Sequence, residues 1–289
     1  ESFFVICVVA SYFIFPMFVN KTNPASTEWL QVYFLLGGIS LLAFLLLFIS
    51  PLDESAAKDT QPDATSNNFG GMFKLLATPI VLVFIVCAFM YVLLEQSIMS
   101  WLPTFNKDVL KLSDVLSIRM ASILAGSIAL GRFLTGIILR KISWIALLIS
   151  CLCIAAVLVL YAMPAINTFI ASYKGGNITD IGEVPFIAFI FPLIGFLLAP
   201  IYPVINSIIL SSLAKPKHGL MAGLIIVFSA LGGSSGSLIT GNIFEHFGGQ
   251  TAFYFSLAPI GLLIGGLFIF NRMHKKTNTD VEFNKMGGH

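Results

Sequence analysis

The chain has 289 residues, of which 57% are hydrophobic and only 10% are charged, and its formal net charge at pH 7 is +2. Soluble domains carry about 25% charged residues, so this composition and a mean hydropathy of +0.93 exclude an ordinary soluble domain and indicate an integral membrane protein. The basic residues are spread over span ends and short connectors, which argues against a nucleic-acid partner, because a phosphate backbone is bound by a basic stripe.

Eight apolar runs are long enough to cross a bilayer. About 20 apolar residues span a hydrocarbon core of roughly 30 Å, and the period-two alternation of a transmembrane barrel is absent. The sequence therefore predicts an all-α, polytopic helical membrane bundle. We expect spans at residues 2–19, 29–50, 78–100, 116–138, 142–163, 185–210, 219–243 and 252–271.

A long polar connector at residues 51–77 predicts the domain organisation. Its Pro, Ser, Asn, Asp and Gly content is typical of a disordered linker. It separates two spans in residues 1–50 from six spans in residues 78–271, and residues 272–289 form a tail. The chain opens at Glu1 and enters a span directly, without the charged n-region and cleavage site of a signal peptide, so we interpret its beginning as missing.

The distribution of Lys and Arg predicts the orientation. Connectors on the side of the linker and tail contain ten of these residues, and those on the other side contain four. Basic residues are retained preferentially in the cytoplasm. We therefore expect a multi-pass protein of the plasma (inner) membrane, with the linker and C-terminus cytoplasmic.

The six spans after the linker indicate an inverted repeat of three spans each. The first span of each triplet carries an aromatic and a polar residue four positions apart, Tyr91 with Glu95 and Tyr202 with Asn206. Residues four apart share a helix face, and transporter sites lie where such disrupted spans correspond. The alternative is that the tyrosines belong to the interfacial aromatic belts.

Glu95 is the strongest functional candidate, because a charge inside a span normally faces a wet cavity or a partner. It lies about 9 Å of helix before Trp101. Arg119 begins the next span from the same surface, so an ion pair of Glu95 with Arg119 is geometrically possible. Three interpretations remain: a substrate or proton site, an ion pair or outer gate with Arg119, and an unpaired group kept neutral by burial.

Gln96 lies on a second polar stripe, with Ser100 four residues further on. These groups would hydrogen-bond either a polyol or a neighbouring helix. The cysteines and histidines show no metal-ligand spacing, so we expect no metal and no cofactor. No catalytic Ser, His and Asp set and no phosphate-binding loop is found, so we do not expect an enzyme.

The segment "GRFLTGIILRKIS" (131–143) resembles the short cytoplasmic loop of the major facilitator superfamily. Arg132, Gly136, Arg140 and Lys141 fit its pattern, whereas Leu139 stands at a position where that family often has an acid. The resemblance implies twelve spans in two halves, of which this chain has two and then six, so the first four spans of a complete transporter are missing. It also implies a gating role for Arg132 and Arg140.

Three segments resemble the fucose permease group of proton-linked sugar symporters: "EQSIMSWLPTF" (95–105), "GRFLTG" (131–136) and "APIYPVINSIILSSL" (199–213). This resemblance implies that Glu95 and Gln96 face the substrate and that Tyr202 and Asn206 line the cavity from the facing span. Tyr91, one turn before Glu95, joins this predicted site.

The predicted function is a secondary active transporter that moves a small neutral solute, a monosaccharide, with protons by alternating access. The alternatives are a non-transporting scaffold or receptor of the same fold, and a transporter of organic anions or drugs. The expected partners are a small-molecule substrate, protons and the lipid bilayer.

Overall fold

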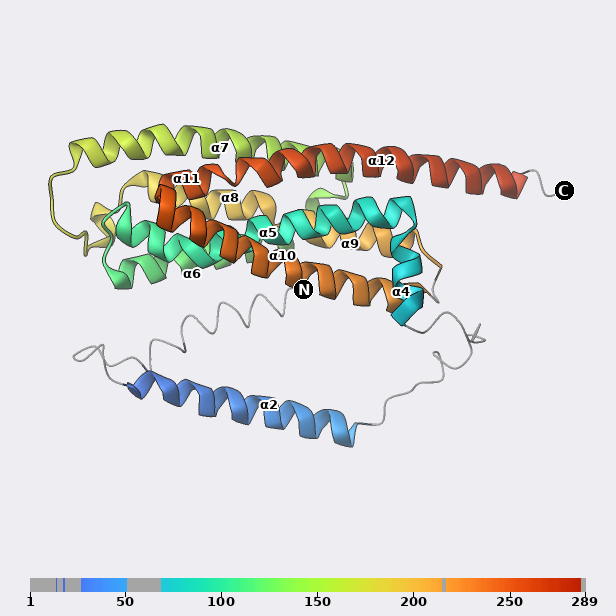
Figure 1. The fold of residues 1–289 in the computed structure, drawn as a ribbon, viewed down its shortest axis with the longest axis horizontal. Coiled ribbons are helices and arrows are strands. Elements are labelled where there is room, and N and C mark those ends of the chain that lie inside the picture. The colour runs from blue at the N-terminus through green and yellow to red at the C-terminus, as the bar shows by residue number, and fades with distance from the viewer. Residues whose placement is uncertain (1–13, 15–17, 19–26, 51–68, 215–216, 287–289) are drawn as a thin grey trace.

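The computed structural model describes residues 14, 18, 27–50, 69–214 and 217–286, and the account below concerns those residues. They form helices that run back and forth along one direction (Figure 1). The elements in chain order are η2 (Thr27–Leu30), α2 (Gln31–Ile49), α4 (Phe69–Leu76), α5 (Pro79–Asp108), α6 (Asp114–Ile138), α7 (Trp144–Ser172), η3 (Ile181–Glu183), η4 (Phe186–Phe189), α8 (Ile190–Leu198), α9 (Ile201–Ser211), α10 (His218–Phe247), α11 (Gly249–Tyr254) and α12 (Leu257–Met286).

Seven segments of the described chain are long and apolar enough to cross a membrane. They correspond to the predicted spans from residues 29–50 onward, and they confirm the prediction of a polytopic helical bundle. Nearly all of the remaining predicted span, at residues 2–19, lies outside the described residues. Residues 69–76, which the sequence assigned to the linker, form the short helix α4, and the tail continues α12 as helix to Met286.

Two helices run further than predicted, because a proline does not end them. Helix α5 continues through Pro103 to Asp108, and α7 continues through Pro164 to Ser172. A proline removes one backbone hydrogen bond, but transmembrane helices tolerate this loss where neighbouring helices pack around it. The buried side chains of Leu102 and Phe105 hold the last turns of α5 against the bundle.

The fourth span of the six after the linker is broken into α8 and α9. Helix α8 ends at Leu198, and α9 starts again at Ile201 after the cap residue Pro200. Pro200 and Pro203 have no N–H to donate, so two helical hydrogen bonds are missing in this segment, while the backbone of Ala199 and Pro200 keeps helical φ and ψ angles. The break lies directly before Tyr202.

Helices α5 and α10 form a close seam through glycines. A Cβ atom added at Gly232 would lie 2.6 Å from the carbonyl oxygen of Phe89, and one added at Gly236 would collide with the carbonyl oxygen of Leu93. The Ser97 hydroxyl reaches across the seam to the Gly236 oxygen at 3.1 Å. Small residues of this kind let membrane helices approach backbone to backbone.

Helices α6 and α8 form a second glycine seam. A Cβ atom at Gly131 would lie 2.6 Å from the Phe196 carbonyl oxygen, and one at Gly195 would collide with the Leu124 side chain. In each seam the first helix of one three-span triplet packs against the second helix of the other triplet. These helices are α5 and α10 in the first seam, and α8 and α6 in the second. Likewise α5 packs against α12 while α8 packs against α7, which is the exchange of neighbours expected of the repeat.

Helix α2 lies apart from helices α4 to α12 (Figure 1). Its mean hydropathy is 2.6, and 6% of it is buried, with Val32 its buried residue. Because its whole circumference is apolar, such a helix requires lipid or further apolar helices around it.

Substituting Gly236 by Ala tests the first seam. The added methyl group has no space against the Leu93 carbonyl, and we expect the free energy of unfolding to fall by about 1–3 kcal/mol. Gly265→Ala in α12 is the control, because a Cβ atom there meets nothing within 4 Å and alanine favours a helix. The measurement is the thermal unfolding midpoint of the complete protein in detergent, and equal midpoints for the two variants would contradict the packing described.

Candidate functional site

An ion pair joins the middle of α5 to α6. The Arg132 Nη2 atom donates to Glu95 Oε1 at 2.8 Å, and the two side chains are 11% and 15% exposed. Two opposite charges in contact allow both to remain ionised in a span, where either alone would be costly. The pair contributes no net charge to the centre of the bundle.

Tyr91 completes this group from the preceding turn of α5. Its hydroxyl donates to the same Glu95 oxygen at 2.9 Å, and its side chain is fully buried. The spacing of four residues brings the phenol and the carboxylate to one helix face. Oε1 therefore accepts from both a guanidinium and a phenol, which fixes the carboxylate orientation.

The aromatic ring of Tyr91 links this group to the broken span. It stacks on the Tyr202 ring with centroids 5.5 Å apart and planes inclined by 22°. The Tyr202 hydroxyl lies 2.9 Å from the Ser229 Oγ atom of α10. A continuous line of contacts thus runs from Arg132 through Glu95, Tyr91 and Tyr202 to Ser229.

Asn206 lies one turn beyond Tyr202 on α9. Its Oδ1 atom is buried and has no hydrogen-bond partner within the described structure. A buried acceptor without a donor costs about 1–3 kcal/mol, so such a group points to a donor supplied from elsewhere.

Comparison with known proteins bears on what this arrangement is for. The family model of the Major Facilitator Superfamily matches residues 2–178. The chain belongs to this superfamily. The match runs from the first predicted span through the linker region and α5 to α7, so it includes both halves of the Glu95 and Arg132 pair. Among curated proteins, no relative matches the chain.

Membership in the superfamily makes the protein a membrane transporter. It confirms the major facilitator fold predicted from the loop motif, and this family consists of transporters rather than enzymes. Within the described residues, no group of three or more His, Cys, Asp or Glu side chains is arranged to hold a metal ion.

The predicted pairing of Glu95 with Arg119 was wrong. Arg119 is exposed and lies about 20 Å further along α6 than Arg132, too far to reach Glu95. The prediction assumed that α5 ends near Trp101, whereas it runs on to Asp108. Glu95 is therefore deeper below the outer end than the sequence suggested.

The remaining predicted residues lie outside the line of contacts. Gln96 is exposed and lies against α10, where a Cβ atom at Gly233 would be 3.3 Å from its Cγ atom. Arg140 is exposed in the turn between α6 and α7. Ser229 was missed, because nothing in the sequence distinguishes it from the other serines of α10, which are Ser234, Ser235 and Ser237.

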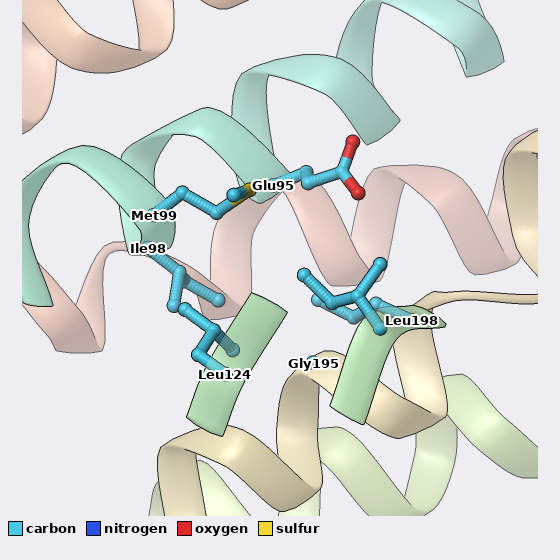
Figure 2. A pocket seen from close by; sticks show the side chains of 7 residues that line it. Glu95, Ile98, Met99, Leu124, Gly195 and Leu198 are labelled. Atoms are coloured by element: carbon cyan, nitrogen blue, oxygen red, sulfur yellow. The ribbon is translucent and has the colours of Figure 1, made fainter. Parts of the chain in front are cut away.

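The cavity beside Glu95 is small and apolar. Its volume is about 10 Å³, which is room for one water molecule at most. Figure 2 shows Glu95 with the apolar side chains around it; the lining residues are Glu95, Ile98, Met99, Leu124, Ile128, Gly195 and Leu198. Of the three interpretations of Glu95, an ion pair describes this geometry, with Arg132 as the partner.

Removing one member of the pair is expected to be worse than removing both. Glu95→Gln or Arg132→Gln leaves the opposite charge without its counterion, at a cost of about 3–5 kcal/mol in the free energy of unfolding. The double variant leaves no charge and should recover much of that loss. Unfolding midpoints of the three variants check this, and a double variant no more stable than the weaker single variant would contradict it.

Proposed function

We propose that the complete protein is a secondary active transporter that moves a small neutral solute, a monosaccharide, together with protons by alternating access. The proposal follows the resemblance to the fucose permease group and builds on membership in the superfamily. The single observation that carries it is the ion pair of Glu95 and Arg132, which places two opposite charges in the middle of a membrane span.

The solute site is formed by polar groups on the broken span and its neighbour. Tyr202 and Ser229 present two hydroxyls, and Asn206 presents a buried acceptor. Hydroxyl groups of a sugar both donate and accept hydrogen bonds, so they match this set. The neutrality of the ion pair supports a neutral solute, because an organic anion would require a surplus of cations.

Proton coupling depends on the Glu95 carboxylate, which accepts hydrogen bonds from both Arg132 and Tyr91. When Glu95 takes up a proton, its attraction to Arg132 weakens and the guanidinium becomes available to oxygen atoms of the solute. Arg132 alone in the membrane is unfavourable, so protonation without solute is unfavourable too. Proton and solute consequently bind together, which is the requirement for symport.

Alternating access supplies the space that the closed cavity lacks. The cavity of about 10 Å³ beside Glu95 is too small for any sugar, so the solute enters only after the two halves move apart. We assign residues 1–50 to the first half and residues 78–271 to the second, with the linker and tail in the cytoplasm at the plasma membrane.

Two alternatives remain. An organic anion or drug substrate would bind Arg132, which is paired with Glu95 in this structure. A scaffold or receptor of the same fold would retain the helix seams without a transport cycle. Solute uptake separates both from a sugar symporter.

Glu95→Gln is the test of coupling. In vesicles containing the complete protein and an imposed proton gradient, we expect accumulation of labelled monosaccharide to fall at least tenfold, because glutamine cannot exchange a proton. Exchange of internal for external sugar should continue. Glu245→Gln, at an exposed acid near the end of α10, is the control, and proton-driven accumulation by Glu95→Gln at the level of this control would refute the proposed coupling.

Asn206→Ala tests the solute site. Loss of one hydrogen bond to a neutral group costs about 0.5–1.5 kcal/mol, which predicts a rise in KM of about 2- to 13-fold for the sugar. Asn242→Ala is the matched control, since its amide donates to Leu238 of its own helix at 2.9 Å. An unchanged KM in Asn206→Ala would remove this residue from the site.

A further inference from the structure

The C-terminal end of α9 is held by side chains from other helices. Among the described elements, α5 is the main neighbour of α9, and α9 follows Pro200, which has no N–H to donate to the preceding turn. The last carbonyl groups of any helix lack partners within that helix. In α9 the Ile208 oxygen accepts from the Ser212 N–H at 3.0 Å and the Leu210 oxygen accepts from the Leu213 N–H at 3.3 Å, so the two residues after α9 hold its last turn.

His218, the first residue of α10, contacts one of these two residues. Its Nε2 atom lies 3.0 Å from the carbonyl oxygen of Leu213, two residues beyond the end of α9. A carbonyl oxygen only accepts hydrogen bonds. The Nε2 atom therefore carries the hydrogen and donates it.

His274 on α12 supplies a second donor. Its Nδ1 atom lies 3.1 Å from the Ser212 Oγ atom, and that hydroxyl donates its hydrogen to the Ile208 oxygen at 2.8 Å. A hydroxyl has a single hydrogen, so Nδ1 is the donor in this contact. Ser212 thus connects His274 to the last turn of α9 through two hydrogen bonds.

The His274 ring is itself fixed between two aromatic rings. It meets Trp144 of α7 edge-on, with centroids 6.4 Å apart, and stacks on Phe270 at 6.3 Å. The two histidines therefore bring donors from α10 and α12, supported by α7, onto the consecutive residues Ser212 and Leu213. We call His218 and His274 the histidine clamp.

We propose that the histidine clamp consists of positioning residues that fix the C-terminal end of α9, and through it Tyr202 and Asn206. Tyr202 contacts Ser229 and the Tyr91 ring, and both contacts depend on where α9 lies after the proline break. This inference rests on the proposed function only in assigning solute binding to Tyr202 and Asn206. The clamp itself is independent of the solute.

Two pairs of substitutions test whether the hydrogen-bond donors of His218 and His274, rather than their rings, hold the end of α9. His218→Gln places an amide nitrogen near the position of Nε2, and His274→Asn places one near the position of Nδ1, so this amide pair keeps both donors. His218→Leu with His274→Leu removes both. His246→Leu is the control, because the Nδ1 atom of His246 contacts Asn242 of its own helix at 2.9 Å.

The measurement is amide hydrogen exchange of residues 201–213 in the complete protein in detergent. We expect the leucine pair to raise exchange there at least tenfold, while the amide pair and the His246 control stay within about threefold of the unchanged protein. If the leucine pair does not fold, each single leucine variant is measured, with an expected rise of at least threefold.

Two results would overturn the clamp: unchanged exchange in the leucine variants, or exchange in the amide pair as fast as in the leucine pair. Labelled glucose, galactose and fucose uptake by the same variants is measured in parallel. The clamp predicts a higher KM in the leucine pair that the amide pair restores, and a restored exchange rate without restored KM would overturn its effect on Tyr202 and Asn206. Because exchange requires no substrate, absence of uptake by the unchanged protein would refute the sugar assignment alone.

Discussion

The structure depends on how one charge is accommodated in a span. Glu95 is held by the Arg132 guanidinium at 2.8 Å and by the Tyr91 hydroxyl at 2.9 Å. Isolated, either ion would be expelled from hydrocarbon or would lose its charge. Paired, they fix the position of α5 along α6, and a displacement of one helix turn would leave both ions without partners. Such a pair provides specificity of arrangement more than stability, because desolvation offsets much of its attraction.

Two glycine seams place this ion pair between two groups of helices. One seam joins α5 to α10 and the other joins α6 to α8, and each brings side chain or backbone atoms to the surface of a glycine. Glycines at these positions let the paired helices approach closely. The polar line from Arg132 to Ser229 crosses between the two groups, so any relative motion of the groups must act on its hydrogen bonds and its aromatic stack.

The fourth span after the linker contains a local interruption between α8 and α9. Pro200 and Pro203 remove two helical hydrogen bonds between α8 and α9, so contacts at the sides and at the end of α9 also hold it in place. Tyr202 contacts Tyr91 and Ser229 near the start of α9, and the histidine clamp acts on its last turn and the residues that follow. The buried apolar side chains of α9 add to these polar contacts; they are Ile201, Val204, Ile205 and Ile209.

Hydropathy and residue spacing by themselves determined the class of this protein, the number and limits of most described spans, and the motif that identified the superfamily. These features follow from local constraints: a span needs enough apolar residues, and residues four apart share a face, as Tyr91 and Glu95 do. The tertiary structure decided which residues meet. Arg132, and not Arg119, pairs with Glu95, because α5 runs past Pro103 to Asp108 and this sets the depth of Glu95. The tertiary structure also places Ser229 of α10 beside Tyr202 of α9. The relative position of packed helices depends on the fit of both surfaces and is not encoded in either helix alone.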